Sequence, residues 1–397
     1  AVARPAGVEP LGSCADACRR HLPASGRGTL PVSWSGWLGW QGYIAMHAEM
    51  VARVAAGGPS PRALVWACHP AMPCGGHGDR LKGIVASFAL AMVTERAFFV
   101  DAPDPWDLGL FLQPSLLDWR ASGLSSSPRG RQVLWDHDLF ESSRLDELLE
   151  ADDQLWVLYT NKRSLLGPLL RHPRLAARAQ PLGLLQAPNL AHQVWRVLFR
   201  PTEALERHWR RLEAQLGGHG ARYVALHHRA GDFAAGFGVV NGEIDRRSTR
   251  GDLLGMMSCA HALERRLGLP NSSRWYLAAD GAGVLEVPQI QAWRASGKLI
   301  VNAGLRPARH LATEGVVPPS GAQMPPRPPS VGNVGQQVPE ASASLLGVAD
   351  SWVDFLALSR AAAVVVSSSA FGLMAAQVGG VLHVHSVQGC VRMDTVA

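Results

Sequence analysis

The sequence lacks several patterns that mark common classes of protein. It contains no Cys-x-x-Cys pair, which disfavours zinc ribbons and thioredoxin-like redox chemistry. Only three of its 38 basic residues are lysines, and neither a block of basic residues nor an RNA-binding aromatic motif occurs. The formal charge of +6 permits an anionic partner, but the sequence does not predict a nucleic-acid-binding protein.

Long apolar runs are also missing. No stretch of about 18 apolar residues occurs, so the sequence contains neither a membrane span nor an obvious secretory signal, and we expect it to be soluble as it stands. Its 397 residues, 47% hydrophobic and 18% charged, predict a globular protein with a large core and favour two domains. The six cysteines could all pair, and Cys14–Cys18 and Cys68–Cys74 are close enough to pair locally.

Short apolar runs alternate with glycine-rich turns along the chain, which indicates an α/β protein. An apolar strand, a glycine loop, a helix and a second strand make a βαβ unit, which predicts a parallel sheet covered by helices. Along the chain we expect a stem or lead-in at residues 1–60, this βαβ unit at 63–101 and a mostly helical middle at 103–220. A second α/β series follows at 222–397, with a proline-rich insertion within it at about 305–345.

The glycine-rich stretch CGGHGDRLKG, residues 74–83, stands between the first strand and its helix. It is neither a P-loop nor a G-x-G-x-x-G turn, because Gly-Lys-Ser/Thr is missing and Leu81 takes the third glycine position. A glycine turn at a helix N-terminus still offers backbone N–H groups to an anion, and Arg80 adds a guanidinium. A tight turn with solvated charges is the competing interpretation.

A second polar cluster, LHHRAGD at residues 226–232, follows another expected strand. In open parallel sheets, ligands bind beyond the carboxyl ends of the strands, and Arg229 has the planar fork that suits a diphosphate. His227 and His228 would point to opposite faces of the strand, which disfavours a shared metal ion. A solvated loop is the alternative.

Three consecutive serines, Ser367 to Ser369, end a third expected strand and precede a helix at residues 369–380. Their hydroxyls and the free N–H groups of the helix would form a cradle for an oxyanion or a phosphate. Simple N-capping by one serine is the alternative. A nucleophilic serine is disfavoured because no Gly-x-Ser-x-Gly occurs.

Carboxylates supply two further candidates. Asp136-His137-Asp138 has the D-x-D spacing that ties a divalent metal to a nucleotide diphosphate, although such a pair can also simply start a helix. Asp101 and Asp280 end two apolar strands, where a carboxylate can bind a base or a sugar hydroxyl, or cap the next helix.

Taken together, these motifs resemble the GDP-fucose-dependent fucosyltransferase superfamily. This superfamily includes α1,6-fucosyltransferases, rhizobial chitooligosaccharide fucosyltransferases, plant xyloglucan fucosyltransferases and protein O-fucosyltransferases. The similar segments agree in order across about residues 62–390. They are the glycine loop with its helix and strand, the helix within 198–209, His227-x-Arg229-x-Gly231-Asp232, the strand ending at Asp280, and Ser369-Ala370-Phe371-Gly372.

The resemblance implies a GT-B-like α/β fold, with two Rossmann-like domains facing a cleft, here residues 61–205 and 206–397. It also implies a hexosyltransferase that transfers L-fucose from GDP-fucose to a hydroxyl group with inversion and without a bound metal. Arg229 would hold the β-phosphate and stabilise the leaving GDP. Asp79 is a candidate general base.

The remaining residues implied by the resemblance contact the donor. They are Gly76, Gly78 and Arg80 closing over it, His227 and Asp232 around guanosine, Asp280 at the guanine edge, and Ser367, Ser368, Ser369 and Phe371 around the diphosphate and ribose.

The acceptor stays open: a glycan, a cell-wall polysaccharide or a protein hydroxyl all fit. No carboxylate soon after Asp232 matches the base of the α1,6 branch. The resemblance implies the lumen of the Golgi or endoplasmic reticulum, behind an N-terminal anchor that this sequence does not contain, and the Asn271-Ser272-Ser273 sequon fits that compartment. A bacterial relative would be cytosolic. Two alternatives remain: a non-catalytic protein that binds a nucleotide sugar or glycan, and a metal-dependent glycosyltransferase that uses Asp136 and Asp138.

Overall fold

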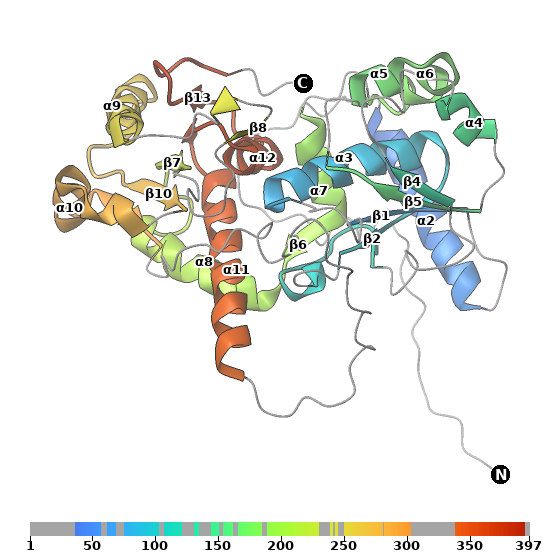
Figure 1. Cartoon of the computed structure of the whole chain (residues 1–397), viewed down its shortest axis with the longest axis horizontal. Coiled ribbons are helices and arrows are strands. Elements are labelled where there is room, and N and C mark those ends of the chain that lie inside the picture. The colour runs from blue at the N-terminus through green and yellow to red at the C-terminus, as the bar shows by residue number, and fades with distance from the viewer. Residues whose placement is uncertain are drawn as a thin grey trace, which may run out of the picture. The chain divides into compact units, whose positions relative to one another are not determined.

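The structure is a computed structural model that describes most of the chain between residues 36 and 393. The described ranges are 36–56, 62–68, 75–102, 107–120, 131–134, 144–150, 154–161, 166–184, 189–229, 239–240, 243–244, 250–280, 282–302 and 338–393. They contain two parallel sheets and the helices that pack against them (Figure 1). The predicted α/β class is therefore confirmed. The D-x-D at 136–138, the proline-rich segment and Asp232 lie outside these ranges.

The N-terminal sheet has four parallel strands in the order β2-β1-β5-β4. These strands are β1 (Ala63–Ala67), β2 (Ala97–Asp101), β4 (Arg131–Leu134) and β5 (Leu155–Tyr159). The helices of this part are α2 (Gly36–Ala55), α3 (His77–Val93), α4 (Arg144–Glu150), α5 (Leu166–Arg171), α6 (Pro173–Ala179) and α7 (Leu190–Leu198). Because β1 and β2 pair in parallel and α3 connects them, the predicted βαβ unit is confirmed.

The middle of the chain is less helical than we expected. Strands β4 and β5 lie within residues 103–220, and β5 pairs with β1 inside the sheet. Short antiparallel strands β3 (Leu112–Pro114) and β6 (Phe199–Pro201) also lie there. The sequence of β5, LWVLY, is a short apolar run, and periodicity alone does not separate a buried strand of this kind from a buried helix. The prediction of a mostly helical middle is wrong for these strands.

Helix α2 lies in the segment that we expected to be a lead-in, yet it packs against the N-terminal sheet. The hydroxyl of buried Tyr43 donates to the carbonyl of Arg96 at 2.7 Å. Trp40 is fully buried, with its ring centroid 5.7 Å from that of Phe88. The lead-in interpretation is therefore wrong for α2. The domain limits at 61–205 and 206–397 stay predictions.

The C-terminal sheet has five parallel strands in the order β11-β10-β7-β12-β13. These strands are β7 (Val224–His228), β10 (Trp275–Ala279), β11 (Leu299–Val301), β12 (Ala363–Val366) and β13 (Val384–Ser386). The helices are α8 (Glu203–Leu216), α9 (Arg250–Arg266), α10 (Pro288–Ala295), α11 (Val338–Ser359) and α12 (Ala370–Gly379). The remaining short elements are η1 (Leu108–Leu110), η4 (Ala282–Glu286) and the pair β8 (Val239–Val240) and β9 (Glu243–Ile244).

Alternate residues of the C-terminal strands enter different hydrophobic cores, as the two-residue period of a strand requires. In β7, Val224 and Leu226 pack in a core with residues of α9, whereas Ala225 joins a larger core that includes α11 and α12. That larger core also contains α3 and α7 and one face of β1. Helices α3, α7, α11 and α12 therefore join the two sheets through one continuous hydrophobic core.

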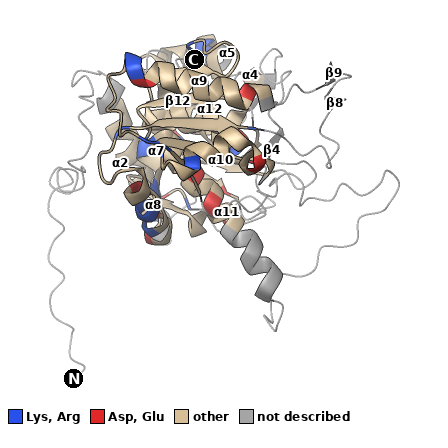
Figure 2. Ribbon diagram, turned by 90° about the vertical axis from the view of Figure 1, so that its left-hand side faces the viewer, with Lys and Arg blue, Asp and Glu red and all other residues tan. Residues whose placement is uncertain are grey.

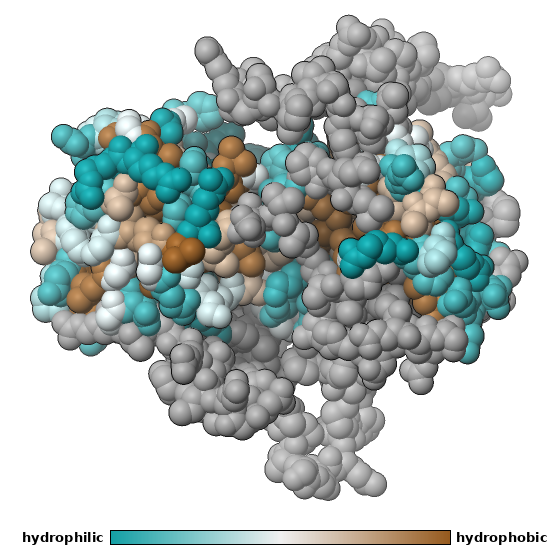
Figure 3. Space-filling model, turned by 90° about the horizontal axis from the view of Figure 1, so that it is seen from above, coloured by the Kyte–Doolittle hydropathy of each residue, from teal (hydrophilic) through white to brown (hydrophobic). Residues whose placement is uncertain are grey.

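Two views, Figure 2 and Figure 3, show how charged, hydrophilic and hydrophobic residues are distributed over parts of the described surface. Charged residues of both signs gather on α8 (Figure 2), and hydrophilic and hydrophobic residues are interspersed over the face seen in Figure 3. Among the described helices, none combines the length and the apolar composition that crossing a membrane requires.

Candidate functional site

Three of the predicted site residues meet where neighbouring strands of the C-terminal sheet end. Arg229 follows β7, Asp280 follows β10 and Ser367 follows β12. The Nε atom of Arg229 lies 3.1 Å from Oδ2 of Asp280, and the two side chains are 20% and 12% exposed. The backbone N–H of Arg229 donates to Oγ of Ser367 at 3.0 Å. Parallel pairing of β7 with both β10 and β12 explains this convergence.

The three serines have three different environments. Ser367 is buried, and its backbone N–H donates to the carbonyl of His227 at 3.0 Å. Ser368 is exposed. Ser369 is the N-cap of α12, and its side chain accepts the N–H of Phe371 at 3.3 Å. N-capping thus accounts for one of the three serines, and the helix that it caps starts beside Arg229 and Ser367.

The glycine loop meets the start of α12. Helix α3 begins at His77, and Gly76 is its N-cap residue. A Cβ atom at Gly78 would lie 2.6 Å from the backbone nitrogen of Phe371, so only glycine lets the first turns of α3 and α12 come this close. Two helix N-termini, each with a partial positive charge, therefore meet at the carboxyl edge of the C-terminal sheet.

His77 connects this loop to α11. Its Nε2 lies 2.8 Å from Oγ of Ser351, and its ring centroid lies 4.2 Å from that of Trp352. Since Ser351 donates its hydroxyl hydrogen to the carbonyl of Val348, Nε2 of His77 is the donor in their contact. Burial, with a smaller effect of Arg80, lowers the pKa of His77 to about 3, so the ring is neutral. Sequence reasoning missed both partners, which lie 274 and 275 residues further along the chain.

The charged residues of the loop lie on the first two turns of α3. Arg80 donates from Nε to the carbonyl of Gly75 at 3.0 Å. Asp79 pairs with Lys82 at 3.2 Å, and the two side chains are 38% and 29% exposed. Asp79, the candidate base, thus has a cationic neighbour on its own helix.

His227 lies beneath α12. Its ring centroid is 5.3 Å from that of Phe371, and a Cβ atom at Gly372 would lie 2.7 Å from its Nδ1. Burial lowers the pKa of His227 to about 3. The side chain therefore supports Phe371 and the start of α12 from below. His228 is buried as well, on the opposite face of β7, as the alternation of a strand predicts.

A pocket adjoins the glycine loop. It is lined mainly by apolar side chains of both halves of the chain, with His77 and Arg80 as its polar members. The lining residues are Trp66, His77, Arg80, Leu81, Ile84, Ala102, Leu108, Phe111, Val348 and Trp352. Val348 and Trp352 of α11 were not among the residues that the motifs singled out.

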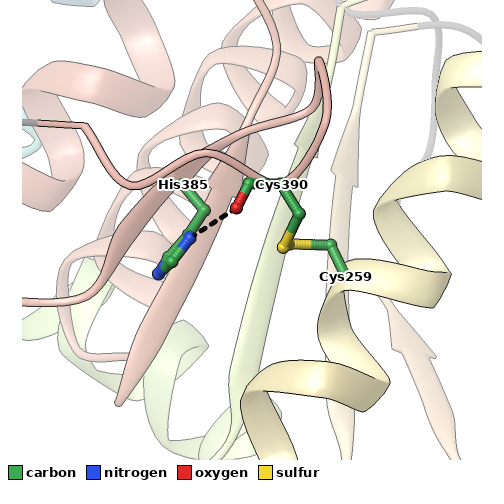
Figure 4. Close-up of side chains that lie close together, drawn as sticks. All are labelled: Cys259, His385 and Cys390. Atoms are coloured by element: carbon green, nitrogen blue, oxygen red, sulfur yellow. Dashed lines mark hydrogen bonds between the residues drawn. A yellow bond between two sulfur atoms is a disulfide. The ribbon is translucent and has the colours of Figure 1, made fainter.

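Within the described part of the chain, one cluster has metal-ligand composition: Cys259, His385 and Cys390 (Figure 4). Cys259 and Cys390 form a disulfide across 131 residues, and Nδ1 of His385 lies 3.1 Å from the carbonyl oxygen of Cys390. With both sulfur atoms in the disulfide, the cluster is a covalent cross-link between α9 and the segment after β13. This pairing was not predicted, because separation along the sequence carries no signal for it.

One solved fucosyltransferase structure has a fold similar to this one. A mutant of Arabidopsis thaliana FUT1 in complex with GDP aligns with a TM-score of 0.56 and 15% identity, over 89% of this chain and 79% of that one. Fucosyltransferase NodZ from Bradyrhizobium aligns with a TM-score of 0.44 and 14% identity, over 80% and 93%. NodZ alpha-1,6-fucosyltransferase soaked with GDP-fucose gives 0.43 and 13%, over the same shares. No family model and no curated protein sequence matches the chain.

The class that these observations define is an α/β protein with a GT-B-like fold, as predicted. More particularly, the likeness to Arabidopsis FUT1 shows that the resemblance to fucosyltransferases seen in the sequence motifs extends to the fold.

Proposed function

We propose that this protein is a glycosyltransferase that transfers L-fucose from GDP-fucose to a hydroxyl group of a glycan or a protein, with inversion at the anomeric carbon. One observation carries the proposal: Arg229, Ser367 and the N-termini of α3 and α12 converge at the carboxyl edge of the C-terminal sheet. The fold shared with a FUT1 structure in complex with GDP supports it.

The convergence suits a diphosphate for electrostatic reasons. Helix N-termini offer unpaired N–H groups and a partial positive charge to an anion, and a guanidinium can contact two phosphate oxygens at once. Arg80 on the first turn of α3 adds a second guanidinium. The contacting N-termini of α3 and α12, with Arg80 on α3 and Arg229 beside Ser367, favour a ligand with more than one negative charge.

The same groups would assist the transfer. As the acceptor oxygen attacks the anomeric carbon, the bond from that carbon to the β-phosphate oxygen breaks and negative charge develops on GDP. Arg229 would stabilise that charge, and Ser369 and Phe371 would hold the diphosphate and ribose. Asp79 is the candidate that would accept the proton of the acceptor hydroxyl. Because the cationic groups of the protein can neutralise the leaving group, we expect no requirement for a metal ion.

A secretory compartment is the proposed location. The Cys259–Cys390 disulfide is of a kind that persists in oxidising environments. Asn271 of the sequon lies exposed in a turn after Pro270, as a glycosylated asparagine does. Both features support the lumen of the Golgi or the endoplasmic reticulum.

A binding titration tests the donor assignment. Calorimetry of the wild-type chain with GDP, UDP, ADP and GDP-fucose, each with and without EDTA, should give the tightest binding for the guanine nucleotides and no effect of EDTA. A preference for UDP that EDTA abolishes would move the site to Asp136 and Asp138 and overturn the proposal. If GDP-fucose binds but is neither hydrolysed nor used for transfer to any acceptor in a glycan and peptide screen, the protein is instead a non-catalytic binding protein.

A further inference from the structure

Asp280 is an unexpected neighbour for a residue that binds phosphate. A carboxylate close to an anion site repels the ligand, and the repulsion is strong where solvent is scarce. Asp280 is nevertheless 12% exposed and lies directly against Arg229. Any contribution of Asp280 to donor binding must therefore come from its attraction for the guanidinium and not from a direct contact with the diphosphate.

The contact holds Arg229 from one side. Oδ2 of Asp280 approaches Nε of Arg229, the guanidinium nitrogen nearest the aliphatic stem, at 3.1 Å. A carboxylate at that position fixes the plane of the guanidinium, and the two terminal nitrogens are the atoms at the tip of the side chain. The backbone of Arg229 is held separately by Ser367. The main chain and the side chain of Arg229 are thus fixed from two neighbouring strands.

We propose that Asp280 is a positioning residue, which orients the guanidinium of Arg229 toward the donor diphosphate, in place of the guanine-edge contact that the family resemblance implies. This inference rests on the proposed function. It means that Asp280 acts through Arg229, independently of which base the nucleotide carries. The two roles differ in the part of the ligand that senses the carboxylate, so they can be separated by experiment.

A double-mutant cycle provides the first test. Kd for GDP is measured by calorimetry for the wild type, Arg229→Ala, Asp280→Ala and the double variant, and we expect Asp280→Ala alone to weaken binding about tenfold. In the Arg229→Ala background the same change should have no effect or should tighten binding, because only the repulsion remains. Equal effects of Asp280→Ala in both backgrounds would overturn the inference.

Comparison of GDP with inosine diphosphate provides the second test. Inosine diphosphate lacks the 2-amino group of guanine, which is one of the groups that would donate a hydrogen bond to a carboxylate at the guanine edge. If Asp280 acts through Arg229, Asp280→Ala weakens the binding of both nucleotides by the same factor. The ratio of their Kd values then stays at the wild-type value. Loss of the preference for GDP in Asp280→Ala would overturn the inference and support the guanine-edge role.

Kinetics provide a third readout. Misorientation of Arg229 should lower kcat by about tenfold to a hundredfold, and Asp280→Asn, which keeps an oxygen able to accept from Nε, should recover part of the loss. The matched control is Glu264→Gln. Glu264 pairs with Lys298 at 2.6 Å in the same half of the chain, and these side chains are 11% and 19% exposed, much like Asp280 and Arg229. We expect this control to leave kcat and Kd unchanged.

The tests separate this inference from the proposed function. If the wild type binds GDP and Arg229→Ala weakens that binding, but the cycle is additive, only the inference about Asp280 is wrong. If the wild type binds no guanine nucleotide, the proposed function and the inference are both overturned.

Discussion

Two ion pairs of nearly equal burial stand at opposite edges of the C-terminal sheet. Arg229 and Asp280 follow the carboxyl ends of β7 and β10, whereas Lys298 precedes β11 and pairs with Glu264 near the end of α9. Their side chains are exposed by 20% and 12% in the first pair and by 19% and 11% in the second. Burial and pairing therefore do not distinguish the ion pair of the proposed donor site from the other pair.

The surroundings of the two pairs differ. Nζ of Lys298 donates to Glu264, to the carbonyl of Ser273 and to that of Asn271, and Ser273 donates its hydroxyl to Glu264. The amino-edge pair is thus tied into the protein by its own neighbours, and Lys298 also offsets the negative end of the helix dipole of α9. The carboxyl-edge pair instead lies beside Ser367, which precedes α12, and the first turn of α12 contacts that of α3. In a parallel sheet the helix direction makes the carboxyl edge the side for anions.

Replacement of Arg229 should give the largest effect on activity. We expect Arg229→Ala to lower kcat for fucosyl transfer by about a thousandfold, because a cationic donor to the developing charge is lost. Arg229→Lys should recover little, since an ammonium group lacks the bidentate fork. Transfer assays with GDP-fucose measure the loss, and thermal melts establish that the variant is folded. A folded Arg229→Ala protein with wild-type turnover would contradict the assignment of the carboxyl edge as the donor site.

The close approach of α3 and α12 is the next feature to break. A methyl group at position 78 would overlap the backbone of Ala370 and Phe371, so Gly78→Ala should cost about 2 kcal/mol of stability and weaken GDP binding by separating the two helix N-termini. The measurements are urea denaturation and calorimetry with GDP. Gly255→Ala on α9 is the matched control, because an added Cβ meets nothing within 4 Å there, and it should gain up to about 1 kcal/mol. Unchanged GDP affinity in Gly78→Ala would argue against a role of the helix contact in binding.

The amino-edge pair should matter for stability alone. Lys298→Ala leaves Glu264 without its cation, and we expect a loss of about 2 kcal/mol in the free energy of unfolding, less than for a fully buried pair. GDP affinity and kcat should stay at wild-type values in the folded variant. A selective loss of activity would show that the two edges are coupled and would weaken the contrast drawn between them.

Much of the carboxyl edge could be predicted from local sequence, because each element carries its own signal. The runs VALHH, WYLAA and AVVV are short and mostly apolar and are followed by polar residues, which is the pattern of buried parallel strands. The glycines of the loop and the serine before α12 mark turns and helix starts. These local signals place Arg229, Asp280 and Ser367 at strand ends without showing which of them touch.

Contacts between distant segments could not be predicted in the same way. The pairing of Arg229 with Asp280, the bond of His77 to Ser351 and the Cys259–Cys390 disulfide each depend on strand order and helix packing, which no single segment encodes. Strand β5 was missed because an apolar run of five residues fits either a strand or a helix. The part of α11 in joining the halves of the chain depends on the same packing.

A third carboxylate packs on a face of the same sheet. We expect its replacement to have the smallest effect on stability, and that effect depends on pH. Asp354 of α11 accepts hydrogen bonds at Oδ1 from the hydroxyl of Tyr276 and from Asn302. Burial raises the pKa of Asp354 to about 7, above its value in an unfolded chain. Between about pH 4 and 7 the folded state therefore keeps a proton that the unfolded state releases, so this group makes the wild type less stable as the pH rises through that range.

Asp354→Asn cannot lose a proton. We expect its stability relative to the wild type to rise by about 1 kcal/mol from pH 4 to pH 5 in urea denaturation. A difference that does not change with pH would mean that folding leaves the pKa of Asp354 unchanged, and would contradict the effect of its burial.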